Sequence, residues 1–321
     1  MRVSSSHITA FLLALGMGFA HAQDYPQRPI AVIVAYPAGG MVDSVTRVVL
    51  EPVAKSLSQP VLVENRPGAE GTIGALAVKR AAADGYTLLS AGSFVETSPL
   101  LKLNPAFQSS DFTPVGIIGQ GANVIVTSPK LPVTTLKEFI AYARARPAQL
   151  NAATGSKGGS VYLGTELFMH STGVQMNPVP FRGANEMIPS LASGELHLAF
   201  LPASIATAMI KLGKVKALAV VAPVRLVNLP EVPTVLEAGL PASGMVAPWY
   251  GLVARTGTPE PVVARWNAEI GAALRSPAVR EKLQQLGVTP MSLSVAEYGR
   301  MLAAERLQWA TLFKERGIKP D

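Results

Sequence analysis

Apolar and polar residues follow two different periods along this chain. Residues 30–36 form an unbroken apolar run, which is typical of a strand buried on both faces of a sheet. A Pro-Ala-Gly-Gly turn at residues 37–40 ends the run, and apolar residues then recur at helical spacing between Val42 and Leu57. The pattern therefore predicts a buried strand, a glycine turn and an amphipathic helix.

The same succession is repeated along most of the chain. Further strands are predicted at residues 61–63, 86–91, 124–126, 150–153, 196–201, 215–221 and 251–254, and further helices at residues 72–82, 134–146, 161–170, 260–274 and 294–316. The first three strands alternate with helices, and this order predicts a parallel sheet covered on both faces. Because the pattern restarts after residue 123, two similar α/β halves are expected.

The first 22 residues have the features of a secretory signal. Arg2 precedes an apolar stretch at residues 8–19, and Ala20 and Ala22 fit a small-x-small cleavage site. The stretch is shorter than the ~20 apolar residues that span a bilayer. We therefore expect a cleaved signal peptide at residues 1–22, rather than a membrane anchor, and a mature protein that is soluble in the periplasm.

Composition narrows the classes of function. A chain of 321 residues suggests about two domains. It contains no cysteine, which excludes disulfides, thiolate metal sites and a cysteine nucleophile. The formal charge is +7, but the basic residues are scattered, so we expect no nucleic-acid partner and only a general attraction for anionic solutes.

Two glycine-rich loops are the strongest candidates for a binding site. Residues 37–43 and residues 154–160 each connect a predicted buried strand to a predicted helix. In parallel sheets, ligands bind beyond the carboxyl ends of strands. The first N–H groups of a helix have no partner within the helix, and they favour anions. Two such loops facing each other would hold a carboxylate with uncharged donors.

Residues for catalysis are scarce. Only His170 and His197 of the four histidines lie beyond the predicted signal peptide, and His197 fits a structural or surface position in a strand. No nucleophile elbow, P-loop, dinucleotide fingerprint or dense metal-ligand spacing is present in the sequence. We therefore expect no catalytic residues, no metal and no cofactor.

Short motifs along the chain resemble those of one family. They read Tyr25-Pro-x-Arg28-Pro29, Tyr36-Pro37-x-Gly39-Gly40-x-x-Asp43, Val63-Glu64-Asn65-Arg66-Pro67-Gly68-Ala69-x-Gly71-x-Ile73-Gly74, Asp84-Gly85-Tyr86-Thr87-Leu88, Pro180-Phe181-Arg182-Gly183, Leu229-Pro-Glu-Val-Pro-Thr234, Glu237-Ala-Gly-Leu-Pro241 and Gly257-Thr258-Pro259. In this order and spacing they resemble the Bug-type extracytoplasmic solute receptors of tripartite tricarboxylate transporters, over residues 25–321.

The resemblance implies a two-domain α/β fold of the periplasmic-binding-protein class, a type II Venus flytrap with parallel-rich sheets and a ligand cleft between its domains. Residues 23–124 and 251–321 would form the first domain, and residues 125–250 the second. The implied function is capture of a small organic carboxylate by domain closure and its delivery to integral membrane transporter subunits, without catalysis.

The same resemblance implies a set of ligand-binding residues. Carried over by position, they are Ala38, Gly39, Gly40, Asp43, Ser156, Gly159, Ser160, Arg182 and Gly183.

Several positions depart from the family pattern, and they suggest a less polar cleft. Tyr162 stands where the family commonly has histidine, and Leu201 where many members have aspartate. Leu201, Phe94, Val95 and Trp249 suggest a ligand with one carboxylate and an aromatic or otherwise apolar body. Glu96 is expected to be exposed to solvent; alternatively it meets an amine on the ligand.

Two other functions remain open at this point. A sensory adaptor that binds a solute and reports to a membrane signalling protein would have the same sequence features. An exported enzyme that acts on a small carboxylate ester is disfavoured by the scarcity of histidine and the absence of cysteine.

Overall fold

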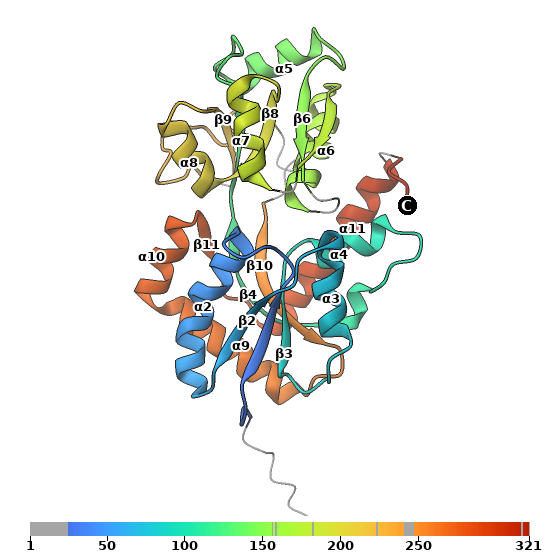
Figure 1. Ribbon diagram of the computed structural model, residues 1–321, viewed down its shortest axis with the longest axis vertical. Helices are drawn as coiled ribbons and strands as arrows, with labels where there is room; N and C mark the ends of the chain where they lie inside the picture. Colours follow the sequence, from blue (N-terminus) through green and yellow to red (C-terminus); the bar gives the residue numbers. More distant parts are fainter. Residues whose placement is uncertain are drawn as a thin grey trace, which may run out of the picture.

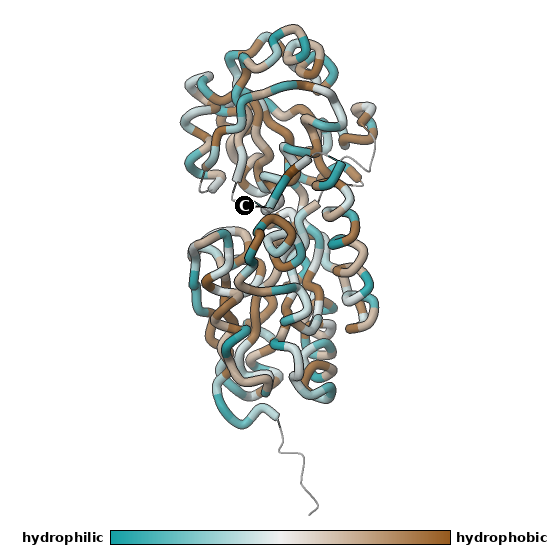
Figure 2. Tube along the Cα trace, turned by 90° about the vertical axis from the view of Figure 1, so that its right-hand side faces the viewer, coloured by the Kyte–Doolittle hydropathy of each residue, from teal (hydrophilic) through white to brown (hydrophobic). Residues whose placement is uncertain are grey.

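The computed structural model describes residues 25–155, 157, 159–181, 183–222, 224–240, 247–315 and 317–320. The predicted signal peptide lies outside these residues. The molecule consists of two lobes stacked along its long axis, each built around one mixed sheet (Figure 1). Apolar residues concentrate along the strands inside both lobes (Figure 2).

The first lobe contains a six-stranded sheet in the order β11-β4-β10-β3-β1-β2. Its strands are β1 (Ile30–Val34), β2 (Val61–Asn65), β3 (Thr87–Ala91), β4 (Phe112–Gly121), β10 (Trp249–Arg255) and β11 (Val288–Pro290). Its helices are α2 (Met41–Leu57), α3 (Thr72–Lys79), α4 (Phe94–Thr97), α9 (Glu260–Arg275), α10 (Pro277–Gln285) and α11 (Val295–Glu315). Two apolar clusters, one centred on Val49, Leu88 and Trp266 and the other on Ile33, Phe94 and Tyr298, form its core.

The second lobe contains a five-stranded sheet in the order β7-β6-β8-β5-β9. Its strands are β5 (Asn123–Thr127), β6 (Asn151–Thr154), β7 (Asn177–Pro180), β8 (Leu198–Pro202) and β9 (Lys216–Val221), and its helices are α5 (Leu136–Arg144), α6 (Ser160–Thr172), α7 (Ala184–Ser193) and α8 (Ala203–Lys211). Helix α5 begins with the capping box that the sequence Thr135-x-x-Glu138 encodes, because Thr135 and Glu138 satisfy each other's backbone N–H groups.

Strand directions follow from the path of the chain. Strand β1 is parallel to both β2 and β3, which confirms the parallel sheet predicted from the first three strands. Strand β10 enters from the second lobe at the end where β3 leaves, so β10 runs antiparallel to β3 and to β4. Strand β5 enters the second lobe at the end where β8 and β9 finish, so it runs antiparallel to both. The α/β fold is therefore as predicted, but its sheets are more mixed than the expected parallel-rich ones.

The chain crosses between the sheets after β4 and again before β10. At the first crossing, the N–H of Gly121 donates to Pro248 O at 2.6 Å and the N–H of Ala122 donates to Gly287 O at 3.1 Å. The first bond joins the two connecting segments, and the second ties the first crossing to the turn between α10 and β11. We retain the predicted domain boundaries, residues 23–124 with 251–321 and residues 125–250, as a proposal in agreement with this change of sheet.

One apolar cluster links the lobes beside the crossings. Trp309, Leu312 and Phe313 of α11 pack with Leu163 and Leu167 of α6, and all of these side chains are buried. Helix α11 therefore contacts the second lobe with its C-terminal part, although it belongs to the first lobe (Figure 1). No helix in the described part of the chain is both long and apolar enough to cross a bilayer.

A candidate ligand site between the lobes

A cavity of about 180 Å³ lies between the two sheets. The residues that line it come from both lobes and from the crossing segments: Tyr36, Met41, Val42, Gly92, Ser93, Phe94, Asn123, Gly155, Gly159, Val161, Gly183, Ala184, Met187, Pro202, Pro248, Trp249 and Tyr250. None of these lining residues carries a formal charge, and aromatic, aliphatic and methionine side chains predominate. The cavity is therefore a mainly apolar chamber with a few polar groups, as is usual for small-molecule sites.

Three of the longer helices begin at this cavity. Helices α2, α6 and α7 start directly after Gly40, Gly159 and Gly183. Glycine has no side chain, so no capping side chain accepts from the first N–H groups of these helices. A Ser, Thr or Asp at this position would accept hydrogen bonds from the first N–H groups of the helix. With glycine there, the positive ends of three helix dipoles are directed toward the chamber, which favours an anion.

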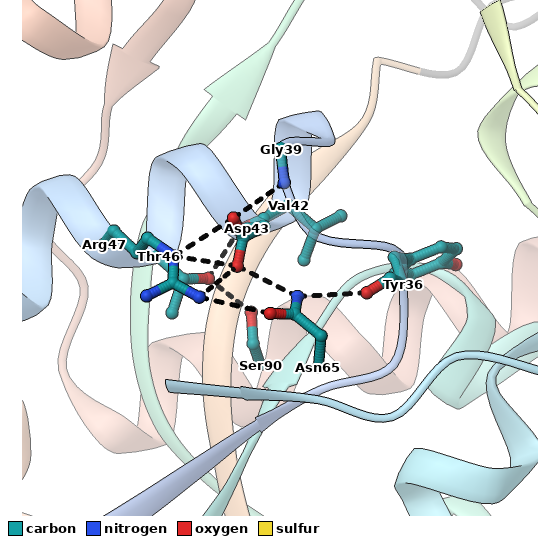
Figure 3. A network of polar contacts seen from close by, with 8 residues as sticks. All are labelled: Tyr36, Gly39, Val42, Asp43, Thr46, Arg47, Asn65 and Ser90. Carbon is teal, nitrogen blue, oxygen red and sulfur yellow. Dashed lines mark hydrogen bonds and ion pairs between the residues drawn. The ribbon is translucent and has the colours of Figure 1, made fainter. Parts of the chain in front are cut away.

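The first glycine loop is held from behind by a polar network around Asp43 (Figure 3). The carboxylate of Asp43 accepts hydrogen bonds from the N–H of Gly39 at 3.0 Å and from Asn65 Nδ2 at 2.9 Å. It also accepts from Arg47 Nε and forms an ion pair with the Arg47 guanidinium at 2.9 Å. Asn65 Nδ2 in turn donates to Tyr36 O at 3.1 Å. The network thus fixes both ends of the turn between β1 and α2.

Asp43 is almost completely buried, and its charge depends on these partners. Burial alone would raise the pKa of the carboxyl group. Hydrogen bonds from Arg47, Gly39 and Asn65 outweigh this effect, so the pKa of Asp43 is lower than its ordinary value. Gly39 has a φ of +75°, a left-handed conformation that glycine adopts without strain. The local sequence therefore sets the shape of the loop before any ligand arrives.

A second carboxylate, which is partly buried, lies directly behind the cavity wall. Glu305 of α11 accepts hydrogen bonds from Ser93 Oγ at 2.6 Å and from the indole Nε1 of Trp249 at 2.7 Å. The indole Nε1 of Trp309 is a third donor, at 3.3 Å. Burial raises the pKa of Glu305, and these three hydrogen bonds oppose the increase. Both Ser93 and Trp249 line the cavity, so Glu305 fixes two of its wall residues.

Asn123 brings an unpaired donor to the chamber. It is the first residue of β5, at the crossing between the lobes, and its side chain is only 2% exposed. Its Nδ2 is buried and meets no hydrogen-bond acceptor in the described part of the protein. A buried amide donor without an acceptor costs roughly 1–3 kcal/mol. A ligand oxygen near Asn123 would relieve that cost.

Some of the site residues predicted from the sequence line the cavity, and others do not. Gly159, Gly183, Phe94 and Trp249 line the cavity. Ala38, Gly39 and Gly40 form the turn that precedes its lining residues Met41 and Val42. Ser156 and Arg182 lie outside the described residues, as does the side chain of Ser160, the first residue of α6.

Three predicted residues lie away from the lining. Asp43 supports the first loop from behind, as described above. Leu201 is fully buried in the apolar core of the second lobe, and its neighbour Pro202 contacts the cavity instead. Tyr162 packs on the cluster between α6 and α11, whereas Val161 contacts the cavity. In a strand or at the start of a helix, adjacent side chains point in different directions, which explains these one-residue displacements.

The expectation that Glu96 is exposed was wrong. Glu96 is only 3% exposed, because α4 packs against α11, and the Arg306 guanidinium lies 3.7 Å from its carboxylate. Burial raises the pKa of Glu96. His197 has a structural role: its Nδ1 accepts a hydrogen bond from the N–H of Asn151 at 3.0 Å, and burial lowers its pKa.

Several lining residues were not foreseen from the sequence. Tyr36, Gly92 with Ser93, and Pro202 all lie just beyond or at the carboxyl end of a strand. Applying the strand-end rule to every predicted strand, rather than to two glycine loops, would have found them. Among the residues that the structure describes, no group of three or more histidines, aspartates or glutamates is arranged to hold a metal ion.

Comparison with known proteins places this geometry in a family. Residues 45–318 match the description "Tripartite tricarboxylate transporter family receptor". The chain is 35% identical over 301 residues to the protein BugT of Bordetella pertussis, an alignment that covers 93% of this chain and 92% of BugT.

Two solved structures have the same fold. One, described as Rpa4515 of R. palustris with adipate, is 32% identical with a TM-score of 0.85, and the match covers 93% of this chain and all of that one, 100%. The other, described as MatC (Rpa3494) from Rhodopseudomonas palustris with bound malate, is 31% identical with a TM-score of 0.80 and covers 90% of this chain and 99% of that one. Both of those proteins are thus similar to this chain over nearly their whole length.

Proposed function

The chain belongs to the tripartite tricarboxylate transporter receptor family, and we propose that it captures a small organic carboxylate between its two lobes. The observation that carries this proposal is the convergence of three glycine-capped helix N-termini on one chamber without charged lining residues. Backbone N–H groups and helix dipoles bind anions without a counter-charge that would have to be desolvated. The adipate and malate complexes of the two similar proteins support a carboxylate as the ligand class.

The body of the ligand is apolar in this proposal. Phe94, Trp249 and Tyr250 contribute aromatic surface to the chamber, and Met41, Val42, Met187 and Val161 contribute aliphatic surface. A hydrocarbon or aromatic ring would bury its surface here at a gain of ~25 cal/mol per Å². We therefore propose an aromatic or otherwise apolar monocarboxylate, such as a benzoate or a medium-chain fatty acid.

Capture would proceed by closure of the lobes. A ligand that contacts α2 in the first lobe and α6 and α7 in the second stabilises the closed form by the difference in its affinity for the two forms. We propose that the protein is exported to the periplasm after cleavage at residue 22 and that the closed form delivers the ligand to membrane subunits of a tripartite tricarboxylate-type transporter. No turnover of the ligand is part of this function.

A thermal-shift panel tests the ligand class. The protein from residue 23 onward would be unfolded, refolded to remove carried-over solute, and screened with aliphatic and aromatic monocarboxylates, dicarboxylates, citrate, and the uncharged amides of the same acids. A ligand at ~100 times its Kd adds roughly 2.7 kcal/mol of stability, a shift of several degrees. Shifts from acids but not from their amides are expected; equal shifts from both would contradict the proposal.

A variant of the second loop tests the location. Gly159 has a φ of −78°, so a larger residue can adopt its backbone conformation, and a Gly159→Trp side chain would occupy the chamber. Leu212→Trp is the control, because Leu212 is 65% exposed and lies after the end of α8, away from the chamber. We expect unchanged melting of both unliganded variants and loss of binding only in Gly159→Trp. Unchanged affinity of a folded Gly159→Trp would place the ligand elsewhere.

A further inference from the structure

We propose that Glu305 is a specificity-determining residue that makes one wall of the ligand chamber a hydrogen-bond acceptor, so that the site rejects a second carboxylate on the ligand. This inference rests on the proposed function and concerns the end of the ligand that is not held by the helix N-termini. It assigns a role in selectivity to the C-terminal helix, which does not itself line the cavity between the lobes.

The wall consists of Ser93 and Trp249, and Glu305 engages the hydrogens of both. Trp249 Nε1 donates to Glu305 Oε2 at 2.7 Å, which leaves only the carbon surface of the indole for the chamber. Ser93 Oγ lies 2.6 Å from Glu305 Oε1, the short distance of a hydroxyl that donates to a carboxylate. Since a serine has one hydrogen, the oxygen of Ser93 can only accept on its remaining sides.

The ionised form of Glu305 is consistent with its surroundings. An indole N–H donates but never accepts, and Trp249 and Trp309 approach different oxygens of the carboxylate. Each oxygen therefore already accepts a hydrogen bond, as in a partly buried carboxylate that is paired with neutral donors. The charge of Glu305 lies one hydroxyl away from the ligand chamber.

This arrangement has a consequence for the ligand. A hydroxyl or an ammonium group beside Ser93 can donate to its oxygen, and an ammonium group also gains from the charge of Glu305. A methyl group rests against Trp249 without a polar contact. A carboxylate would find no donor on this wall and would face a like charge in a mainly apolar chamber, where such repulsion is strong.

Glu96 provides a control for the charge of Glu305. It is a buried carboxylate that pairs with Arg306 of α11, and removing its charge changes the net charge by the same amount. Its ion-pair partner is Arg306, it does not line the chamber, and among the described contacts no hydrogen bond joins its carboxylate to Ser93 or Trp249. A substitution there tests whether any buried charge is sufficient or whether the contact through Ser93 is required.

Two series of acids that differ only at the far end measure the selectivity. One series is hexanoate, 6-hydroxyhexanoate, 6-aminohexanoate and adipate; the other is benzoate, 4-hydroxybenzoate, 4-aminobenzoate and terephthalate. Calorimetry on the full mature protein would give the Kd of each. In the series that binds, we expect the hydroxy acid to bind at least ~10-fold more tightly than the dicarboxylate, because juxtaposed like charges are strongly unfavourable.

Glu305→Gln should change this ranking in opposite directions for opposite charges. The glutamine oxygen can retain the bond from Trp249, and its amide then donates to Ser93 Oγ while the 3.3 Å bond from Trp309 is lost, which frees the Ser93 hydrogen for the chamber. In Glu305→Gln, the affinity of the dicarboxylate relative to the unsubstituted acid should rise about 10-fold above its wild-type ratio. The affinity of 6-aminohexanoate relative to hexanoate should fall below its wild-type ratio, as expected for removal of one nearby charge. Glu96→Gln should leave both ratios within about 3-fold of the original, as expected for a charge without that contact.

A second variant and a ligand-independent measurement cover the case of poor folding. Ser93→Ala removes the acceptor and should abolish the preference for the hydroxy acid over the unsubstituted acid. In ¹⁵N spectra of the indole groups, Glu305→Gln should shift the signals of Trp249 and Trp309 and leave Trp266, which donates to Tyr25 Oη, in place.

The outcomes separate this inference from the proposed function. A dicarboxylate that binds wild-type protein as tightly as the hydroxy acid would overturn the inference and leave the carboxylate receptor intact. Equal changes of selectivity in Glu305→Gln and Glu96→Gln would overturn it as well. Failure of all eight acids to bind would contradict the proposed ligand class, and the inference with it.

Discussion

Replacing Asp43 with asparagine should weaken both the fold and the ligand site, although Asp43 does not line the chamber. The carboxylate accepts from the N–H of Gly39, from Asn65 Nδ2 and from Arg47. An asparagine of the same shape has one oxygen, so its amide must face either Gly39 or the Arg47–Asn65 pair, donor against donor. Loss of one charge-assisted bond and of one acceptor amounts to about 2–4 kcal/mol of unfolding free energy.

The sign of the pH dependence follows from the lowered pKa of Asp43. A carboxyl group whose pKa is lower in the folded state binds fewer protons there than in the unfolded chain. Its contribution to stability is complete above the unfolded value of about 3.9 and is lost as the pH falls through the lower folded pKa. The difference between wild type and Asp43→Asn should therefore be full at neutral pH and should shrink below a pH of about 4.

Chemical denaturation at several pH values, together with calorimetry of the best acid from the thermal-shift panel, measures both effects. Asp111→Asn is the matched control. Asp111 also has a lowered pKa and accepts from the N–H of Gln108 at 2.7 Å, but it lies outside the cavity lining. Both variants should lose stability, and only Asp43→Asn should lose affinity. Wild-type stability of Asp43→Asn at neutral pH, or a difference that persists in acid, would refute the argument.

Two further substitutions test the packing around the site. Leu163→Ala removes a fully buried side chain from the cluster that joins α6 to α11; it should cost about 2–5 kcal/mol and also weaken ligand binding, whereas Leu191→Ala, in the core of the second lobe, should lower only the melting temperature. Tyr25→Phe leaves the indole N–H of Trp266, now 2.7 Å from Tyr25 Oη, without its acceptor and should cost about 1–3 kcal/mol in chemical denaturation. Tyr86→Phe loses only an exposed hydrogen bond that Tyr86 Oη accepts from the N–H of Gln27, so it should cost less than Tyr25→Phe. A larger loss of stability in Tyr86→Phe than in Tyr25→Phe would contradict this ranking.

Elements with a strong hydrophobic period could be predicted from the sequence. Strand β1 and helix α2 lie within two residues of the predicted ranges, since an unbroken apolar run and a helical repeat are hard to satisfy in any other way. The predicted strand at residues 251–254 is the centre of β10, at Trp249–Arg255. Boundaries moved by up to three residues, as in the helix predicted to end at residue 82 that ends at Lys79, because caps and turns determine the ends.

Strand β4, the longest strand described, was not predicted, and its composition explains why. It contains Pro114 and three glycines, residues that are unfavourable inside a strand. Pro114 lies beside a register shift in the pairing with β10. Each glycine is required by a close neighbour: a Cβ on Gly119 would lie 2.5 Å from Thr289 O, and one on Gly121 would lie 2.9 Å from the ring of Tyr250. Tertiary crowding therefore overrides the local preference.

The candidate site also has one part that could be predicted from the sequence and one part that could not. Its glycine turns follow predicted strands, so local sequence was sufficient to indicate them. Glu305 was not foreseen, because 212 positions separate it from Ser93 and its own helix has the pattern of an ordinary amphipathic segment. A partly buried carboxylate at such a distance along the chain becomes visible only when the fold brings α11 against β4 and α4.

The position of α11 relates ligand selectivity to closure of the lobes. Glu305 and Trp309 are four residues apart and share one face of the helix, and the indole of Trp309 donates to the carboxylate of Glu305. Glu305 fixes the wall of the chamber, while Trp309 packs on α6, whose first turn contributes Gly159 and Val161 to the opposite wall. A rotation of the second lobe must either carry Trp309 along or slide α6 over it. The same side-chain pair therefore contacts one wall of the site and the helix that carries the other, so a substitution at Trp309 should alter ligand selectivity and closure together rather than either one alone.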